Sequence, residues 1–244
     1  MNKNLTVGEI WDKRWENIDV NKFKDNAFKH DPWTKHHKPI IEKYIKEIDR
    51  NGVFFEAGCG MGHWCFHVSE KYGIKSVGVD VAEETIDKLQ KNCHNLARFA
   101  VDDLNKSKLE SDSFDMLISL GVIEHFKDSG LMMKNLYRVL KPNGIGIITV
   151  PNVYSVHTIT RPILQLLNKW DIGYEKSFSP KKLKNLSLSN GFKIVEYGVL
   201  PSGDMFGCFL NNIPLVGKIF EKISLFIEKR QNIFGFISFV VVKK

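Results

Sequence analysis

Cysteine is scarce in this sequence and follows no metal-binding or disulfide pattern. The chain of 244 residues has four cysteines, with no C-x-x-C pair and no histidine at the spacing of a zinc site. They are Cys59, Cys65, Cys93 and Cys208. The sequence therefore predicts neither a disulfide framework nor a metal cluster, and we expect reduced, mostly buried thiols.

Long apolar runs are absent as well. Residues 1–15 lack the apolar centre of a signal peptide. The longest apolar run near the end, residues 234–242, is much shorter than the roughly 20 residues that a transmembrane helix needs. We therefore expect a cytoplasmic protein with one substantial core, for which a hydrophobic content of 43% is sufficient.

Acidic residues are in the minority, and the imbalance is local. The formal net charge is +7, and residues 151–244 hold 13 Lys and Arg against 6 Asp and Glu. A basic surface of this kind suits an anionic substrate, a membrane surface or nucleic acid, and it is equally typical of an ordinary solvated face. Charge alone therefore decides no function.

The sequence does contain an alternation of strand and helix patterns from residue 52 onward. We expect strands at residues 52–57, 75–80, 96–101, 113–120, 144–150, 192–200 and 234–242. Helical patterns at residues 62–73, 83–93 and 129–140 lie among the first five strands. Such alternation predicts an α/β fold with a parallel sheet covered by helices.

Residues 1–50 are expected to form a helical cap before the sheet. Thr6 and Glu9 have the spacing of a capping box, which marks the start of a helix. Apolar side chains follow at helical spacing: Val7, Ile10, Trp11, Trp15 and Ile18. On this pattern Trp11 and Trp15 are packing residues, although a helix that closes over a cofactor would use the same aromatics.

Residues 51–244 are expected to form one domain with two insertions. The first, residues 151–178, would act as a lid, and Pro162 within it is expected to open a short helix. The second, residues 201–233, contains an amphipathic helix at 213–229 with a wide apolar face and lysines off that face. That helix predicts peripheral membrane contact or a cover for a lipid-linked substrate, with packing against the domain or a second subunit as the alternative.

Glycine is concentrated in one stretch, residues 54–64, which reads FFEAGCGMGHW. Its pattern E-x-G-x-G-x-G comprises Glu56, Gly58, Gly60 and Gly62. A dinucleotide-binding turn needs G-x-G-x-x-G, and its third glycine is missing in either register. An acid just before the turn disfavours a phosphate and suits a ligand with positive charge. S-adenosylmethionine, which carries a sulfonium and an ammonium group and no phosphate, fits these requirements.

Acids at the ends of the next two strands complete this expected cofactor site. Asp80 follows the last glycine at a distance typical of a residue that accepts both ribose hydroxyls. Asp102 would accept from the adenine amino group, and the backbone of Asp103 and Leu104 would address the ring nitrogens. Further cofactor contacts are expected at Cys59, Val81 and Leu120.

Together these motifs resemble the class I S-adenosylmethionine-dependent methyltransferases, in the small-molecule subgroup that includes the ubiquinone-biosynthesis O-methyltransferases. The similarity covers residues 50–200 and includes FFEAGCGMG, GVD, VDDL, FDMLISLGVIEHF and LYRVLKPNGIGIITVPN. It implies a Rossmann-like sheet of seven strands in the order 3-2-1-4-5-7-6, with the last strand antiparallel and helices on both faces. It also implies methyl transfer from S-adenosylmethionine to a small-molecule, saccharide or lipid-linked acceptor, with S-adenosylhomocysteine as the product.

The sequence departs from one metal-binding variant of this family. Some relatives bind a metal through E-x-x-E-H after the fourth strand. This chain has G-V-I-E-H, with Gly121 in place of the first acid. We therefore expect no metal.

Three residues are candidates for catalysis and acceptor binding. His125, after the fourth strand, is the candidate general base, although a histidine there more often holds a neighbouring loop in place. Tyr154 and His157, just after the fifth strand, are candidate substrate contacts. The chain lacks a D/N/S-P-P-Y/F/W motif after the fourth strand, so we expect no nucleic-acid partner. A protein or RNA methyltransferase and a non-catalytic cofactor-binding subunit are the alternative functions.

Overall fold

The computed structural model describes residues 5–93, 96–168, 170–200 and 234–244. Cys208 and the amphipathic helix expected at 213–229 lie outside these ranges, so what we expect of them stays a prediction. Within the described ranges, no helix is long and apolar enough to cross a bilayer. Cys59, Cys65 and Cys93 are free thiols.

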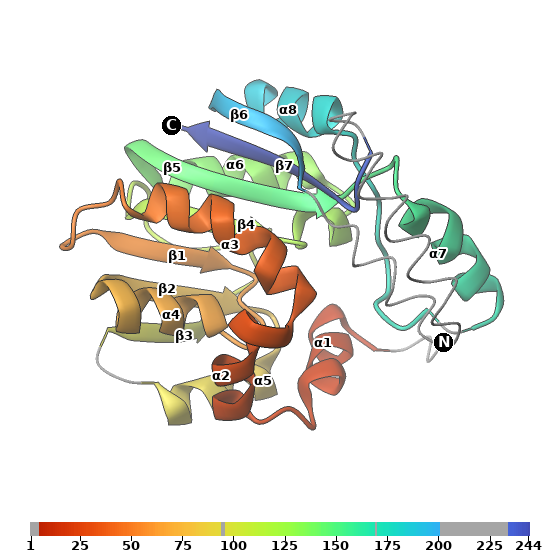
Figure 1. Ribbon diagram of the computed structural model, residues 1–244, viewed down its shortest axis with the longest axis horizontal. Helices are drawn as coiled ribbons and strands as arrows, with labels where there is room; N and C mark the ends of the chain where they lie inside the picture. Colours follow the sequence, from red (N-terminus) through yellow and green to blue (C-terminus); the bar gives the residue numbers. More distant parts are fainter. Residues whose placement is uncertain (1–4, 94–95, 169, 201–233) are drawn as a thin grey trace.

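The centre of the molecule is a seven-stranded sheet in the order β3-β2-β1-β4-β5-β7-β6 (Figure 1). Strands β1 to β5 run parallel to one another, and β7 is antiparallel to both of its neighbours. The bounds are β1 Val53–Ala57, β2 Lys75–Asp80, β3 Ala97–Val101, β4 Phe114–Leu120, β5 Leu140–Pro151, β6 Lys193–Leu200 and β7 Ile237–Lys243. This order and the antiparallel last strand confirm the predicted fold.

Two apolar cores cover the two faces of the sheet. Helices α3, α4 and α5 pack on one face, where Ile41, Trp64 and Leu89 belong to one cluster of buried side chains. Helices α6 and α8 pack on the other face through Met133 and Leu183. The helix bounds are α1 Val7–Trp15, α2 Val20–His30, α3 Pro32–Ile45, α4 His63–Tyr72, α5 Glu83–Asn92, η1 Ile123–His125, α6 Ser129–Val139, α7 Val156–Leu166 and α8 Pro180–Ser189.

Local caps explain where the first helices begin. In α1 the predicted capping box is present: Thr6 Oγ1 accepts from Glu9 N at 3.3 Å, and the Glu9 carboxylate accepts from Thr6 N at 2.7 Å. The helix ends before Ile18, which therefore lies outside it. Asp19 begins α2 by accepting from Lys22 N at 2.8 Å. The division of the chain into an N-terminal cap and a sheet domain stays a prediction.

The prediction that Pro162 opens a helix was wrong. Pro162 lies inside α7, which already begins at Val156. Ser155 Oγ donates to Asn152 O at 2.7 Å, and this contact fixes the chain just before the helix, directly after β5. An anchor at the strand end therefore sets the helix start, and the helix tolerates an internal proline. Leu166, the last residue of α7, is 83% exposed.

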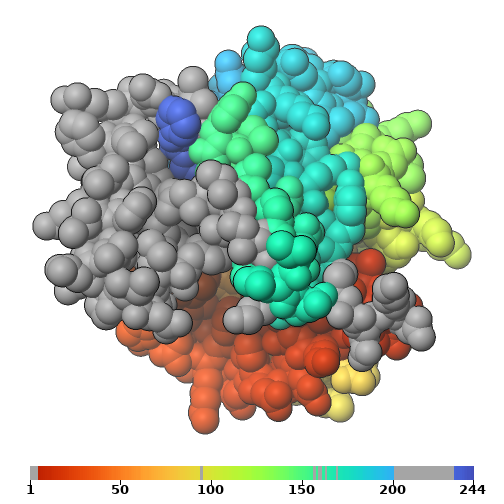
Figure 2. Space-filling model, turned by 90° about the vertical axis from the view of Figure 1, so that its right-hand side faces the viewer, coloured from red at the N-terminus to blue at the C-terminus, as the bar shows by residue number. Residues whose placement is uncertain are grey.

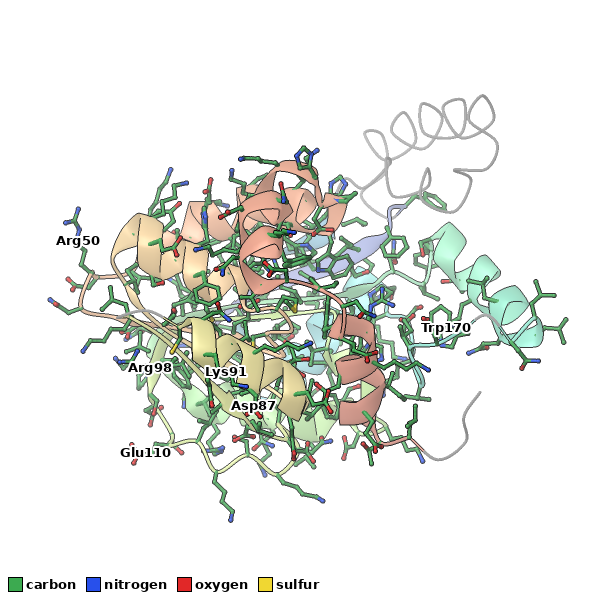
Figure 3. All side chains as sticks on the ribbon, turned by 90° about the horizontal axis from the view of Figure 1, so that it is seen from below. Arg50, Asp87, Lys91, Arg98, Glu110 and Trp170 are labelled. Carbon is green, nitrogen blue, oxygen red and sulfur yellow. The ribbon has the colours of Figure 1, made fainter. Side chains whose placement is uncertain are left out.

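The carboxyl ends of the parallel strands meet at one edge of the sheet, where α1 and α7 lie (Figure 1). Figure 3 shows Trp170, which follows α7, at this end of the molecule, and Arg50, which precedes β1, at the opposite end. Ligands of open parallel sheets bind outside the carboxyl ends of the strands. Because the expected cofactor residues follow β1 to β4, the fold brings them together at this edge.

Candidate functional site

The loop between β1 and α4 requires glycine at all three predicted positions. Gly58, Gly60 and Gly62 have φ angles of 76°, 48° and 64°, a left-handed conformation that other residues rarely adopt. A β-carbon at Gly58 would lie 2.5 Å from Val122 Cγ2, and one at Gly62 would lie 2.5 Å from Phe99 Cε1. The backbone of this glycine loop therefore packs directly against Val122, in the loop after β4, and against Phe99 of β3.

The Asp80 carboxylate fixes the shape of this loop. Its Oδ2 accepts from Gly60 N at 2.8 Å, and its Oδ1 accepts from Ala82 N at 3.1 Å. The backbone N of Cys59 donates to Val79 O at 2.9 Å and ties the loop to β2. Burial raises the pKa of Asp80, and the hydrogen bond from Gly60 opposes this rise. The predicted ribose acid is thus held directly against the glycine loop.

Asp102 lies beside Asp80 because β3 pairs with β2. Its backbone N donates to Asp80 O at 3.0 Å, and its Oδ2 accepts from Ser107 Oγ at 3.2 Å. The other oxygen, Oδ1, is buried and has no hydrogen-bond partner among the described residues. A buried acceptor of this kind favours a ligand that donates, as an adenine amino group does. The residues present therefore fit S-adenosylmethionine, and the assignment of Asp80 to the ribose and Asp102 to the adenine stays a prediction.

Of the remaining predicted cofactor residues, Asp103 and Leu104 follow Asp102, and Leu120 ends β4. Asp103 Oδ1 accepts from Asn105 N at 3.0 Å, and Leu104 O accepts from Asn135 Nδ2 at 2.7 Å. Leu104 is buried, and Leu120 ends β4 half-buried. These bonds hold the backbone of the adenine segment in a fixed shape.

Glu56, the acid predicted just before the turn, is buried at the end of β1. Its side chain is 4% exposed, and its Oε2 accepts from Cys65 N at 3.3 Å. Burial raises the pKa of Glu56 to about 8, so the group is mostly protonated at pH 7. The reason is that the end of β1 is enclosed by the sheet and by α4. A cationic ligand bound nearby would favour the ionised form.

The backbone at Gly121 shows why the metal-binding variant does not fit this chain. Gly121 has a φ of 73°, and its N donates to Thr149 O at 2.9 Å. A β-carbon there would lie 3.0 Å from Trp33 Cζ2 and 3.4 Å from Glu124 Oε1, so an acidic side chain would meet the Trp33 ring. Among the described residues, no three His, Cys, Asp or Glu side chains gather closely enough to hold a metal.

Sequence analysis did not single out Glu124 or Trp33. Glu124 is 2% exposed, and its Oε2 has no hydrogen-bond partner within the described part of the chain. Burial raises the pKa of Glu124 well above its ordinary value, which favours the protonated form of the carboxyl group. The position of Glu124 in the G-V-I-E-H motif could have identified it as a candidate site residue. Trp33 lies in no motif, and its contact with the loop after β4 depends on the fold.

His125 ends the short helix η1 after β4. Its Nδ1 lies 2.8 Å from Tyr174 O, and because a carbonyl only accepts, Nδ1 carries the proton and Nε2 is left as an acceptor. Burial lowers the pKa of His125, so the neutral ring dominates at pH 7. The Trp11 ring packs edge-on at 5.3 Å between centroids. His125 therefore has the tautomer of a general base, and it also ties this loop to the segment after α7.

The segment after β5 covers the same edge of the sheet. Figure 2 shows the N-terminal helices in red next to the residues after β5 in green to teal. Tyr154 is 50% exposed and makes an edge contact with Phe234 at 6.3 Å, and His157 lies in the first turn of α7. Arg161 Nη1 donates to Glu175 Oε1 at 3.2 Å and ties α7 to the chain that follows it. The roles of Tyr154 and His157 stay predictions.

Comparisons with known proteins agree with this geometry. Residues 55–148 match the family model described as a methyltransferase domain. The chain is 27% identical over 174 residues to the ubiquinone biosynthesis O-methyltransferase of Bartonella tribocorum, and the match covers 64% of this chain and 70% of that protein.

Two solved structures are similar to the whole described fold. A chain in the complex between the Haloferax volcanii Trm112 methyltransferase activator and a methyltransferase has a TM-score of 0.70 at 14% identity, with 98% of this chain and 97% of that chain covered. Haemonchus contortus phosphoethanolamine N-methyltransferase 2, in complex with phosphomonomethylethanolamine and S-adenosylhomocysteine, has a TM-score of 0.68 at 17% identity. That match covers 100% of this chain and 61% of that chain.

At these low identities the structural matches support the fold alone. The match to the family model supports methyltransferase activity, because the residues that it spans include the glycine loop, Asp80 and Asp102. S-adenosylmethionine is the cofactor of this family, and the positions of these residues fit it. The matched domain and the named relatives therefore support a class I S-adenosylmethionine-dependent methyltransferase.

Proposed function

We propose that this protein methylates a small-molecule, saccharide or lipid-linked acceptor. The observation that carries the proposal is that the glycine loop, Asp80 and Asp102 lie at the same edge of the sheet as His125, whose Nε2 is free to accept a proton. The names of similar proteins, a ubiquinone biosynthesis O-methyltransferase and a phosphoethanolamine N-methyltransferase, support a small acceptor. They leave the choice between oxygen and nitrogen open.

Each part of the site has a defined task in this proposal. When bound, the cofactor supplies an electrophilic methyl group. The chain's own residues position the reactants, which can lower the barrier by ~7–11 kcal/mol through effective molarity. His125 would accept a proton from the acceptor, a contribution of ~10²–10⁴ in rate. Residues 1–50 would cap the cofactor side, and the lid at 151–178, with Tyr154 and His157, would cover the acceptor side.

The cofactor assignment is tested by binding. We expect calorimetry to show S-adenosylhomocysteine binding and no NAD binding. Asp80→Ala should weaken binding of S-adenosylhomocysteine by about 1–3 kcal/mol, or roughly 5- to 150-fold, because hydrogen bonds to a charged acceptor are lost. Asp87→Ala, which removes an exposed acid of α5, is the matched control and should bind like the wild type. Tight NAD binding, or an Asp80 variant as good as the control, would contradict the assignment.

The acceptor class is tested by transfer of label. The protein is incubated with methyl-labelled cofactor and a fractionated cell extract. Label in small molecules or lipids supports the proposal. Label in protein or RNA supports the alternative substrates, and a protein that binds the cofactor but transfers no label would be a non-catalytic subunit.

We further propose that the protein is cytoplasmic and that residues 213–229 contact a membrane surface or a lipid-linked substrate, on the strength of the sequence pattern. The protein should co-sediment with anionic vesicles, and less so as salt rises, because salt screens the lysines. Replacing both Phe220 and Phe226 with serine should release it and leave S-adenosylhomocysteine binding intact. A protein that ignores vesicles at low salt, or a double variant that unfolds, would indicate a buried helix instead.

A further inference from the structure

Helix α1 lies directly on the turn that follows the expected ribose acid. A β-carbon at Gly8 would lie 2.5 Å from Val81 O, so only glycine allows the helix to approach this closely. On the next turn of α1, Asp12 Oδ1 accepts from Thr85 N at 2.9 Å and from Thr85 Oγ1 at 2.8 Å. Both contacts are made to the segment that begins at Asp80.

The contact with Thr85 supplies a missing helix cap. The N-cap residue of α5 is Ala82, whose side chain has no acceptor, and no side-chain cap bond is made there. Asp12, 73 residues earlier in the sequence, accepts from the third backbone N–H of the helix instead. Helix α5 is therefore capped in this way only while α1 is docked. The same turn carries Ala82 N, which donates to Asp80 Oδ1.

The rest of α1 reaches the other parts of the site. The Trp15 ring would lie 3.3 Å from a β-carbon at Gly60, and Lys88 Nζ donates to Glu16 O at 2.7 Å. The Trp11 ring packs on His125. One helix thus touches the glycine loop, the ribose turn and the candidate base.

The docking of this helix is weakly stabilised by burial. Helix α1 has nine residues, and none of them is buried. Helices this short are marginal without packing of an apolar face. Segments with few buried contacts are the ones that open locally. The polar contacts of Asp12 therefore add to the packing of Trp11 and Trp15 in keeping α1 docked.

We propose that Asp12 is a positioning residue that latches α1 over the cofactor. By capping α5 it holds the turn from Asp80 to Ala82 in shape, and by docking α1 it brings Trp15 to Gly60 and Trp11 to His125. This inference rests on the proposed cofactor role of Asp80. It predicts that α1 closes more tightly when the cofactor site is filled, and that cofactor binding and completion of the acceptor side are coupled through one helix.

The test compares variants of two aspartates that both cap helices. Asp12→Ala is expected to weaken S-adenosylhomocysteine binding at least about tenfold in calorimetry and to abolish the ligand-dependent slowing of amide exchange at residues 7–15. Asp19→Ala, which removes the cap of α2, is the matched control and should change binding less than about twofold. Gly8→Ala displaces α1 without touching the Asp12 carboxylate, and it should weaken binding as Asp12→Ala does. Val7→Ala, which trims an exposed side chain of the same helix, should not.

A second variant separates latching from simple capping. Ala82→Ser added to Asp12→Ala provides a local cap for α5, and it should restore thermal stability while binding stays weak and α1 stays open. If the double variant regains wild-type binding, Asp12 acts only as a cap and the inference is overturned. It is also overturned if Asp12→Ala and Gly8→Ala both bind as the wild type does. A wild-type protein that binds no S-adenosylhomocysteine would overturn the proposed function itself.

Discussion

Replacing His125 with alanine is expected to lower the rate of methyl transfer by ~10²–10⁴ and to leave affinity for S-adenosylhomocysteine nearly unchanged. The ring donates from Nδ1 to Tyr174 O, and this bond leaves Nε2 deprotonated and free to accept. The Trp11 ring packs against its edge and restricts the ring further. The rate is measured as label transfer from saturating cofactor into the extract fraction that accepts methyl groups.

The pH dependence follows from the direction of the pKa shift. Burial lowers the pKa of His125 below the ordinary value of 6.5, so the ring is neutral at pH 7. A base must be deprotonated to act, so the rate should stay level at neutral pH and fall only as the pH drops through this lowered pKa. The acidic limb should therefore have its midpoint below pH 6.5 and should be absent in His125→Ala.

His125→Asn distinguishes catalysis from support of the loop. The asparagine amide can still donate to Tyr174 O, but it has no basic nitrogen. If His125 is the base, this variant should lose as much rate as the alanine variant and keep the thermal stability of the wild type. If asparagine restores the rate, or if alanine costs stability and cofactor affinity in equal measure, the histidine only holds the loop.

The sheet was predictable because each strand carries its own signal. Residues 75–80 were expected as a strand and form β2, Lys75–Asp80, without a change of boundary. Helix α7 was misplaced because its start depends on an anchor between Ser155 and Asn152, after β5, which the local preference of Pro162 does not reveal. Local sequence patterns therefore predict that a helix or strand exists. Contacts that form only in the folded protein determine where it begins and ends.

The same distinction applies to the site. The glycines, Asp80 and Asp102 were predictable because they follow strand ends at fixed spacings, and parallel strands bring these ends together. The contact of Asp12 with Thr85 joins residues from distant helices, so no spacing along the chain indicates it. The raised pKa of Glu56 could not be predicted either, because it depends on how deeply β1 is buried.

Gly62→Ala is expected to destabilise the protein by about 2–5 kcal/mol. The left-handed φ of 64° costs an alanine roughly 1–2 kcal/mol. The added β-carbon would lie 2.5 Å and 2.8 Å from two ring carbons of Phe99 and 3.2 Å from Leu89 Cδ1, an overpacking worth about 1–3 kcal/mol. The measurement is the free energy of unfolding in urea. The m-value, which is the slope of this free energy against urea concentration, should match that of the wild type.

Helix α4 contains its own control for this substitution. Gly73 ends the helix with a φ of 67°, close to that of Gly62, and a β-carbon there would have no heavy atom within 4 Å apart from its chain neighbours. Gly73→Ala should therefore lower the free energy of unfolding only by the cost of the left-handed φ, roughly 1–2 kcal/mol. The difference between the two variants measures the steric contact of the glycine loop with Phe99 of β3 and Leu89 of α5.

Phe99→Leu, combined with Gly62→Ala, locates that contact. The smaller side chain makes room for the β-carbon, so the double variant should be more stable than the sum of the two single changes implies. This coupling should also appear in S-adenosylhomocysteine binding, because β3 leads directly to Asp102 and the loop carries Gly60, the partner of Asp80. If Gly62→Ala costs no more than Gly73→Ala, and Phe99→Leu gives no relief, the glycine loop does not rest on β3 and the expected position of the cofactor against that strand must change.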